Sequence, residues 1–235
     1  MNDKFPVSLK KNTIVEAAFD LRCKLLQPVE VIAVGLLNEY KDMNPTLERL
    51  PINDVPEQIR RNDPNLSKAP LYQISLSSSC IQIGWNGITF VRKTCYPGWS
   101  SLQADLNSFI TYIANSKAVK KLLRVGVRYI NFIEADAAEV CKVTFNSGIQ
   151  NTFERKQFNC SEVFEKDGFL IHTIIANKAK LNGEKEGSVI DIDVFSNLEQ
   201  PFDGDVLSRQ VERIHDICRE VYFSSISEEF LKDLM

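Results

Sequence analysis

The chain has 235 residues, of which 44% are hydrophobic, and its 28 Lys and Arg against 31 Asp and Glu give a formal net charge of −3. A chain of this length buries enough apolar surface for a stable core without disulfides or metals. The near-neutral balance excludes both a strongly basic polyanion-binding composition and a long acidic tail, so any basic surface has to be local.

The N-terminal segment carries positive charges without an apolar stretch behind them, and the longest apolar run, 31–37, is too short to span a bilayer. We therefore expect a cytoplasmic protein without membrane association. The cysteines occur singly, which favours buried free thiols over a zinc site or a disulfide framework. They are Cys23, Cys80, Cys95, Cys141, Cys160 and Cys218.

The first elements follow from hydrophobic periodicity. Alternation over 13–26 predicts a strand, and apolar residues at helical spacing over 29–40 predict a helix for which Pro28 suits the first turn. The range 42–70 contains five prolines, so we expect a Pro-rich irregular segment. Because so long a loop is unusual in a compact domain, this segment is a candidate for function or conceals a short helix.

A run of short strands comes next, over 71–76, 80–85 and 88–93. The pair Asn86-Gly87 between the last two predicts a type I′ hairpin turn, which needs positive φ at both residues. A helix over 101–114 should follow, with Ser100 and Gln103 as its capping box. Its apolar stripe consists of Leu102, Leu106, Phe109, Ile110 and Ile113.

The second half repeats the order of strands followed by a helix. Asp167-Gly168 predicts a turn, and Ser225 with Glu228 predicts the cap of a short last helix. The helix before it, over 205–222, presents Leu207, Val211, Ile214, Cys218 and Val221 as one stripe. The strand-like segments are 123–133, 141–145, 158–164, 169–176 and 189–195.

This order predicts an α+β fold in which antiparallel sheets carry helices packed on one face. We expect one globular domain over 1–235, with two similar strand-rich halves, 1–118 and 119–235, as fused subdomains. Strands 71–93 with helix 101–114 correspond in order to strands 169–195 with helix 205–222. Internal duplication into a saddle-like, pseudo-twofold form is one hypothesis, and chance alternation in an α+β chain is the other.

Enzyme signatures are missing from the sequence. It contains no GxxxxGK[ST], GxGxxG or GxSxG motif, and His172 and His215 are its only histidines. Each has a structural interpretation. His172 fits an outward-facing or a buried, hydrogen-bonded strand residue, and His215 fits a residue that packs a helix on the sheet. We therefore assign no catalytic residue, no cofactor and no enzymatic activity. Asp191 and Asp193 alternate on one strand face, as a cation site requires, but a half-exposed sheet gives the same pattern.

The richest polar constellation lies on the strand over 123–133. Arg124 and Arg128 share one face there, and Gly126 between them permits close approach of another group. Together with the aromatic residues Trp85, Tyr96 and Trp99, they could bind single-stranded nucleic acid or a partner protein. The alternative reading pairs an arginine with Glu16 or Asp20 on the neighbouring strand and places the tryptophans in the core.

Four short motifs occur together in the chain: 13–17 with Arg22, Gly98-Trp99 before a helix, Arg-x-Gly-x-Arg-Tyr-Ile-Asn over 124–131, and His215 followed by Phe223 and a terminal helix. They resemble those of a sporadically distributed, uncharacterised bacterial protein family of about this length. The resemblance implies an accessory gene of mobile or defence-related regions and no activity. This sequence departs from the family pattern at Asn12-Thr13, where the family has prolines. The positions that match its motifs are Arg22, Arg128, Tyr129, Asn131 and His215.

Three functions remain open from the sequence. The first is a non-enzymatic protein-interaction or regulatory protein, such as an antitoxin, immunity or accessory subunit with a protein partner. The second is a nucleic-acid binder that uses a curved sheet face. The third is a small-ligand or nucleotide-binding protein, or an enzyme, with a pocket around Arg128, Tyr129, Asp191, Asp193 and His215. The candidate binding residues are Arg22, Trp99, Arg124, Arg128, Tyr129, Asn131 and His215.

Overall fold

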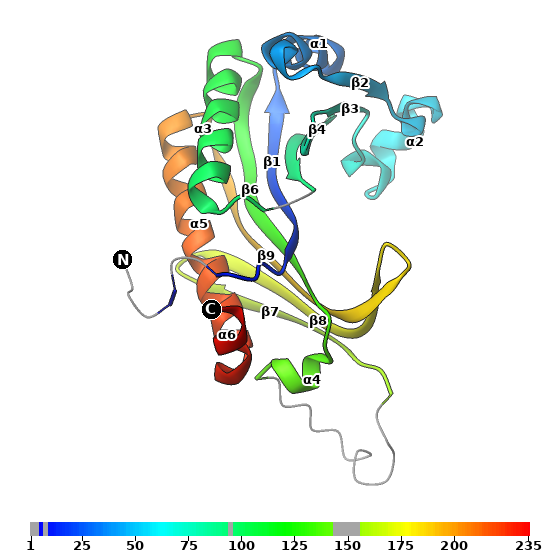
Figure 1. The fold of residues 1–235 in the computed structure, drawn as a ribbon. Coiled ribbons are helices and arrows are strands. Elements are labelled where there is room, and N and C mark those ends of the chain that lie inside the picture. The colour runs from blue at the N-terminus through cyan, green and yellow to red at the C-terminus, as the bar shows by residue number, and fades with distance from the viewer. Residues whose placement is uncertain (1–4, 7–8, 94–95, 143–155) are drawn as a thin grey trace.

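A computed structural model describes residues 5–6, 9–93, 96–142 and 156–235. This part of the chain forms one antiparallel sheet in the order β2-β3-β4-β5-β1-β6-β9-β8-β7 (Figure 1). The strands are β1 (Ile14–Leu25), β2 (Thr46–Arg49), β3 (Tyr72–Ser75), β4 (Ser79–Gly84), β5 (Gly87–Arg92), β6 (Val119–Ile133), β7 (Asn159–Lys166), β8 (Phe169–Leu181) and β9 (Lys185–Pro201). The helices are α1 (Val29–Glu39), α2 (Glu57–Asn62), α3 (Trp99–Ser116), α4 (Ala137–Val140), α5 (Gly204–Ser225) and α6 (Glu228–Leu234).

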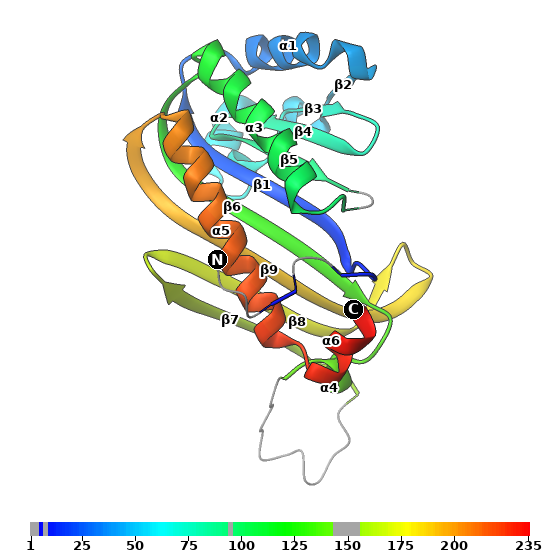
Figure 2. The same cartoon turned by 60° about the vertical axis from the view of Figure 1, so that its left-hand side comes forward.

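The long helices α3 and α5 lie side by side across one face of the sheet, and α1 covers the end near β3 and β4 (Figure 2). All five residues of the apolar stripe predicted for α3 are buried. Of the stripe predicted for α5, all but Val221 are buried. A single hydrophobic core joins these helices to the sheet, and the predicted α+β class is confirmed.

The strand order is similar on the two sides of the central pair of β1 and β6, with five described strands in the first half and four in the second. Strands β1 and β6 are each the first of their half, and β5 and β9, which are the last strands of their halves, flank them. The helix that follows each last strand, α3 or α5, returns across the same face. The second half differs in the connection after its first strand, where the one-turn α4 stands in place of the eleven-residue α1. The order of elements agrees with the duplication hypothesis, but the described strands of both halves form one sheet and not the two sheets that were expected. Duplication itself stays a hypothesis.

The segment 42–70 is built from short elements. Besides α2 and the edge strand β2, it contains the end of the 3₁₀ turn η1 (Lys41–Met43) and the whole of the 3₁₀ turns η2 (Pro51–Asp54) and η3 (Leu66–Lys68). The short helix that its length suggested is α2. The sequence did not indicate β2, because its four residues are all exposed and lack apolar alternation.

The hairpin of β4 and β5 is present, but its predicted turn is wrong by one residue. Gly84 pairs with Gly87, so the loop consists of Trp85 and Asn86, and neither has a positive φ. Gly87 is needed for a different reason, since a Cβ there would lie 2.5 Å from the backbone oxygen of Leu21. Close packing of β5 on β1, and not turn conformation, accounts for this glycine.

Two predicted helix caps are also wrong. Helix α3 begins at Trp99 after Gly98 and has no side-chain cap, so Ser100 lies inside its first turn. The cap of α6 is Ser227, whose Oγ accepts a hydrogen bond from the backbone N–H of Phe230 at 3.1 Å, while Ser225 donates to the carbonyl of Val221. Both sites offered several hydroxyl residues within a few positions, and sequence spacing alone did not distinguish them.

The remaining predictions concern cysteines, one strand and membrane spans. Cys23, Cys80, Cys141, Cys160 and Cys218 are free thiols, and all but Cys160 are buried. Cys95 and most of the predicted strand 141–145 lie outside the described residues, and Cys141 itself forms an isolated bridge with Ile226. Within the described ranges no helix has the length and apolar character needed to cross a membrane.

Candidate functional site

The side of the sheet opposite α1, α3 and α5 carries most of the charged residues that the sequence singled out. Successive strand residues point to opposite sides, and Ala17, Phe19 and Leu21 of β1 are buried toward the helices. We use the term open face for the residues of four strands that alternate with these. They are Glu16, Ala18, Asp20 and Arg22 on β1, Arg124, Gly126, Arg128 and Ile130 on β6, Leu170, His172 and Ile174 on β8, and Asp191, Asp193 and Phe195 on β9.

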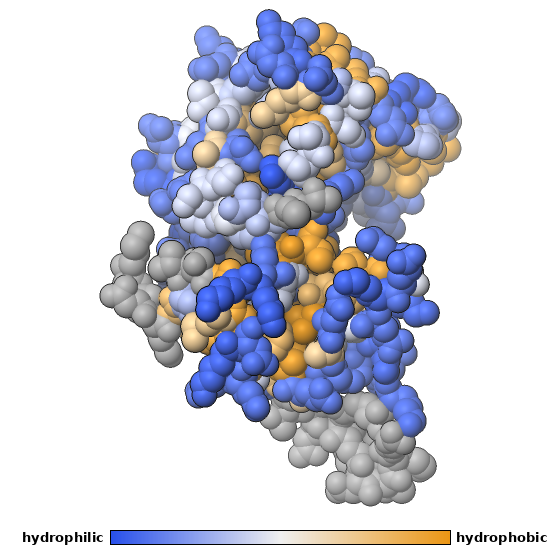
Figure 3. Space-filling view, viewed as in Figure 1, coloured by the Kyte–Doolittle hydropathy of each residue, from blue (hydrophilic) through white to orange (hydrophobic). Residues whose placement is uncertain are grey.

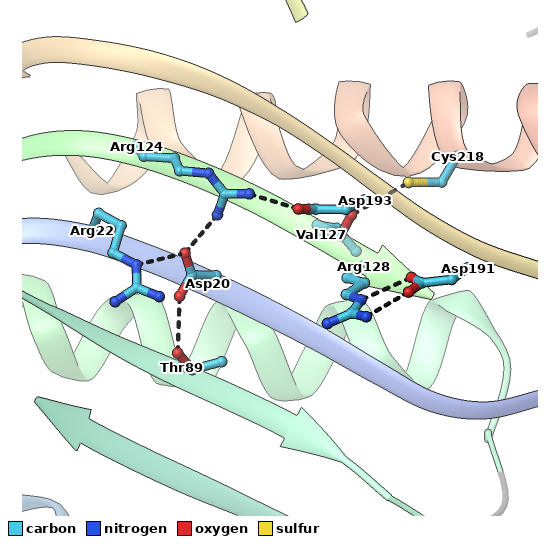
Figure 4. A network of polar contacts seen from close by, with 9 residues as sticks. All are labelled: Asp20, Arg22, Thr89, Arg124, Val127, Arg128, Asp191, Asp193 and Cys218. Atoms are coloured by element: carbon cyan, nitrogen blue, oxygen red, sulfur yellow. Dashed lines mark hydrogen bonds and ion pairs between the residues drawn. The ribbon is translucent and has the colours of Figure 1, made fainter. Parts of the chain in front are cut away.

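Arg124 lies at the centre of an ion-pair network on the open face (Figure 4). Its Nη1 is 2.5 Å from Oδ2 of Asp20 on β1, and its Nη2 is 2.8 Å from Oδ2 of Asp193 on β9. Asp20 also accepts from Nε of Arg22 at 3.1 Å and from Oγ1 of Thr89 at 3.0 Å. The network therefore links four adjacent strands, β5, β1, β6 and β9, across the centre of the sheet.

Arg128 forms a separate, bidentate pair with Asp191 of β9. Its Nε is 2.7 Å from Oδ1, and its Nη2 contacts Oδ2. The carboxylate side chain is only 9% exposed, whereas that of Arg128 is 47% exposed. The hydrogen bonds that Arg128 donates to Asp191 raise the pKa of its guanidinium above its usual value. Arg128 thus compensates a buried carboxylate and still presents one side of its guanidinium to solvent.

Gly126 makes room for the guanidinium of Arg124. A Cβ at this position would lie 3.0 Å from both Nη1 of Arg124 and Cβ of Phe195. The Arg124 guanidinium carbon lies 4.1 Å from the centroid of the Phe195 ring, a cation–π contact. A close approach of another group to Gly126 was predicted, and the group is the side chain of Arg124 on the same strand.

Asp191 and Asp193 share the open face, as their spacing indicates, but each is engaged by an arginine. Burial raises the pKa of Asp193 above its usual value, although Arg124 and Arg128 oppose this shift. Across the described ranges no group of three or more His, Cys, Asp or Glu residues is placed to hold a metal ion. The two ion pairs make Asp193 and Asp191 counter-charges for Arg124 and Arg128.

Tyr129, Trp99 and His215 meet on the helix side of the sheet. The Tyr129 hydroxyl is 3.0 Å from Nδ1 of His215, and Trp99 stacks on the imidazole with a centroid distance of 3.7 Å. Tyr96 packs edge-on against Tyr129. Burial, reinforced by the positive charge of Arg219, lowers the pKa of His215 to about 4. This aromatic cluster joins the start of α3 to α5 and to the central strand β6.

Because Arg128 and Tyr129 are consecutive strand residues, they point to opposite sides of the sheet. Arg128, Asp191 and Asp193 lie on the open face, whereas Tyr129 and His215 lie among the helices. The sheet separates the two groups. The single pocket expected around these residues is therefore not formed, and the prediction that they converge is wrong.

Asn131 also lies on the helix side, in a buried polar network. It accepts from Thr13 Oγ1 at 2.9 Å and donates to the backbone oxygen of Ile190 at 3.2 Å. The hydroxyl of Thr13 is 2.8 Å from that of Tyr222. These contacts hold the start of β1 against β6, β9 and α5, which is a structural role.

The structure thus divides the predicted binding residues by side. Arg22, Arg124 and Arg128 lie on the open face, and Trp99, Tyr129, Asn131 and His215 lie toward the helices. Trp85 joins neither group, because it packs under Arg61 of α2 with a guanidinium-to-ring distance of 4.4 Å.

Sequence reasoning missed Phe195, which supports Arg124 on the open face. It gave His172 as an outward-facing or hydrogen-bonded strand residue, and His172 lies directly opposite Asp193 with its Nε2 2.9 Å from Oγ of Ser161. Alternation along β8 and β9 places both residues, but only the cross-strand register reveals their partners.

Apolar side chains accompany the charges on the open face. Ala18, Ile130, Leu170, Ile174 and Phe195 are all partly exposed. More generally, Figure 3 shows hydrophobic residues at the surface in the lower half of the molecule, near β8 and β9, bordered by hydrophilic ones. Apolar surface rimmed by polar groups is typical of protein-binding surfaces.

Neither the protein-family models nor the curated proteins compared with this chain gave a match. The resemblance to the bacterial family with the central Arg-x-Gly-x-Arg-Tyr-Ile-Asn motif therefore stays a prediction.

Proposed function

We propose that this chain is a non-enzymatic protein-interaction module that binds a partner protein through the open face. The observation that carries the proposal is that the arginines on that face are already ion-paired with carboxylates of the sheet. Arg22 and Arg124 both bond to Asp20, and Arg128 is paired with Asp191. The cations are thus already compensated within the sheet.

This compensation argues against a polyanionic ligand. The open face contains three arginines and four carboxylates, the fourth being Glu16. Nucleic-acid binding draws its affinity from cations that neutralise phosphates, and cations held by carboxylates must first give up those partners. A protein surface with mixed charge and apolar groups requires no such exchange.

The mixture of groups suits a protein partner. Ion-paired arginines with exposed edges, such as the 47% exposed Arg128, offer further hydrogen bonds without an unpaired buried charge. The partly exposed Ile130, Leu170 and Ile174 provide apolar area around them. We place the partner within the bacterial accessory system, antitoxin-like or defence-related, that the family resemblance implies, and we propose the cytoplasm as the site of action.

The test is an affinity pull-down of the tagged protein from its native host, followed by mass spectrometry and an absorbance ratio at 260 and 280 nm. Ile174→Lys places a charge in the open face, and Val34→Lys makes the same change at a 51% exposed position on α1. We expect wild type and Val34→Lys to retain one stoichiometric partner that Ile174→Lys loses, with unchanged thermal unfolding in all three proteins.

Two outcomes contradict the proposal. A partner that Ile174→Lys retains as well as wild type does not bind through the open face. A sample without protein partner but with a high absorbance ratio indicates nucleic acid or nucleotide, and the compensated arginines would then have to open to bind it.

A further inference from the structure

We infer that the chain forms a twofold homodimer in which the edge strands β7 of two copies pair antiparallel. Strand β7 ends the sheet and pairs only with β8, so its outer edge has no neighbouring strand among the described residues. This inference goes beyond the proposed function, because pairing at the edge leaves the open face available to a different partner.

Strand β7 lacks the short length, the prolines and the bulges that protect many edge strands, although it carries the charged residues Glu162, Glu165 and Lys166. It has eight residues, contains no proline, and pairs with β8 without a register shift. Val163 and Phe164, on its two sides, are 64% and 49% exposed. An exposed and regular edge of this length, with Val163 and Phe164 at its centre, is a template for another strand.

The opposite edge of the sheet is protected. Strand β2 has four residues, lies between Pro45 and Pro51, and exposes charged residues at Glu48 and Arg49. Short length and flanking prolines are usual means by which edge strands avoid association, and β7 has neither. This difference in length and in prolines favours β7 as the associating edge.

Hydrogen-bond direction limits the register of a β7 pair. The N–H of Asn177 in β8 donates to the backbone oxygen of Phe158, which directly precedes β7. In an antiparallel ladder the even-numbered residues of β7 therefore direct their backbone groups toward β8, and the odd-numbered residues direct theirs outward. In a β7 pair, the outward backbone N–H and C=O groups of one copy must lie opposite the outward groups of the other. Odd-numbered residues therefore pair with odd-numbered residues, and only every second register is available.

Charge favours one of these registers over the others, including the register centred on Val163, which brings no opposite charges together. Centring the twofold axis on Glu162 or on Glu165 would place identical carboxylates opposite each other, which is unfavourable. Centring it on Phe164 places the two Phe164 rings together and sets Glu162 of each copy opposite Lys166 of the other. Lys166 Nζ is 2.6 Å from Glu220 on α5 and 40% exposed, so it can contact a second carboxylate. The interface is isologous, as a closed dimer requires.

The first experiment measures oligomeric state by analytical ultracentrifugation across a micromolar concentration series. We expect wild type to dimerise and Phe164→Lys, which brings two like charges together, to weaken dimerisation about tenfold or more. Ile59→Lys, at a 56% exposed position on α2, is the matched control and should dimerise as wild type does. A monomeric wild type, or a dimer unaffected by Phe164→Lys, overturns the inference.

A second experiment tests the register by oxidation of full-length Cys160→Ala variants. Cα atoms of a non-hydrogen-bonded antiparallel pair lie about 4.5 Å apart, within the range of a disulfide. Phe164→Cys should therefore form a disulfide-linked dimer, and Val163→Cys should not. Crosslinking of Val163→Cys instead overturns the Phe164-centred register. Glu162→Lys should weaken the dimer, and the double change Glu162→Lys with Lys166→Glu should restore it.

Discussion

His215 shows how a fold can make an ionisable residue structural. It is stacked on Trp99, bonded to Tyr129 and close to the cationic Arg219, so its neutral form is favoured in the native state. No carboxylate contributes to its pKa shift, whose first cause is burial. Packing of α3, α5 and β6 therefore accounts for the position of His215.

This neutral histidine makes stability depend on pH. The unfolded chain takes up a proton near pH 6.5, whereas the native chain resists doing so until about pH 4. The stabilisation is complete above pH 6.5 and is lost as the pH falls toward 4, by up to about 3 kcal/mol. Denaturant titrations across this range should show a weaker pH dependence in His215→Phe than in wild type.

Tyr129→Phe serves as the comparison for that measurement. It removes the hydroxyl that contacts Nδ1 and leaves most of the burial of His215 intact. Because burial is the larger cause of the shift, the pH dependence should persist in this variant. Equal loss of pH dependence in both variants would show that the hydroxyl, and not burial, controls the histidine.

Single-residue roles were only partly predictable from the sequence. Alternation placed Arg124, Arg128, Asp191 and Asp193 on one face, and the pairing of an arginine with Asp20 was one of the two readings. The sequence could not tell that Arg128 pairs across to β9, because that partner is 63 residues away. Register between distant strands is set by the whole sheet and not by local pattern.

At the scale of elements, long periodic segments were predictable and their ends were not. The cores of α3, α5, β1 and β8 follow directly from apolar spacing. Strands β6 and β9 extend beyond their predicted ends, to Val119 and Pro201, where the ladder continues without regular apolar alternation. Backbone pairing with a neighbour extends these strands, and that neighbour is invisible to a local pattern.

The cap of α6 gives a direct test at this scale. Ser227→Ala removes the hydroxyl that accepts from the N–H of Phe230, which should cost about 1 kcal/mol of unfolding free energy. Ser225→Ala removes only a bond from Oγ to the carbonyl of Val221 within α5, so it should cost no more than a few tenths of a kcal/mol. Chemical denaturation measures both, and equal losses would contradict the assignment of the cap.

At the scale of the whole molecule, the two halves share one sheet and one core. Strands β1 and β6 pair along nearly their full length, from Ile14 with Asn131 to Leu25 with Val119. Their helix-facing residues belong to the same hydrophobic cluster as those of α3 and α5. The repeated order of elements was visible in the sequence, but the central pairing that fuses the halves was not, since its partners are about a hundred residues apart.

This shared core predicts that the halves unfold together. Ile192 is buried in β9 of the second half, and Ile192→Ala should lower stability by about 2 to 5 kcal/mol. In a Trp99→Phe background the only tryptophan is Trp85, at the β4–β5 turn of the first half. Its fluorescence should then report the same shifted midpoint as far-UV circular dichroism, because a single cooperative unit has one transition. If Trp85 kept the midpoint of the Trp99→Phe parent while the circular dichroism shifted, the halves would be independent, and the β1–β6 pairing would not couple them.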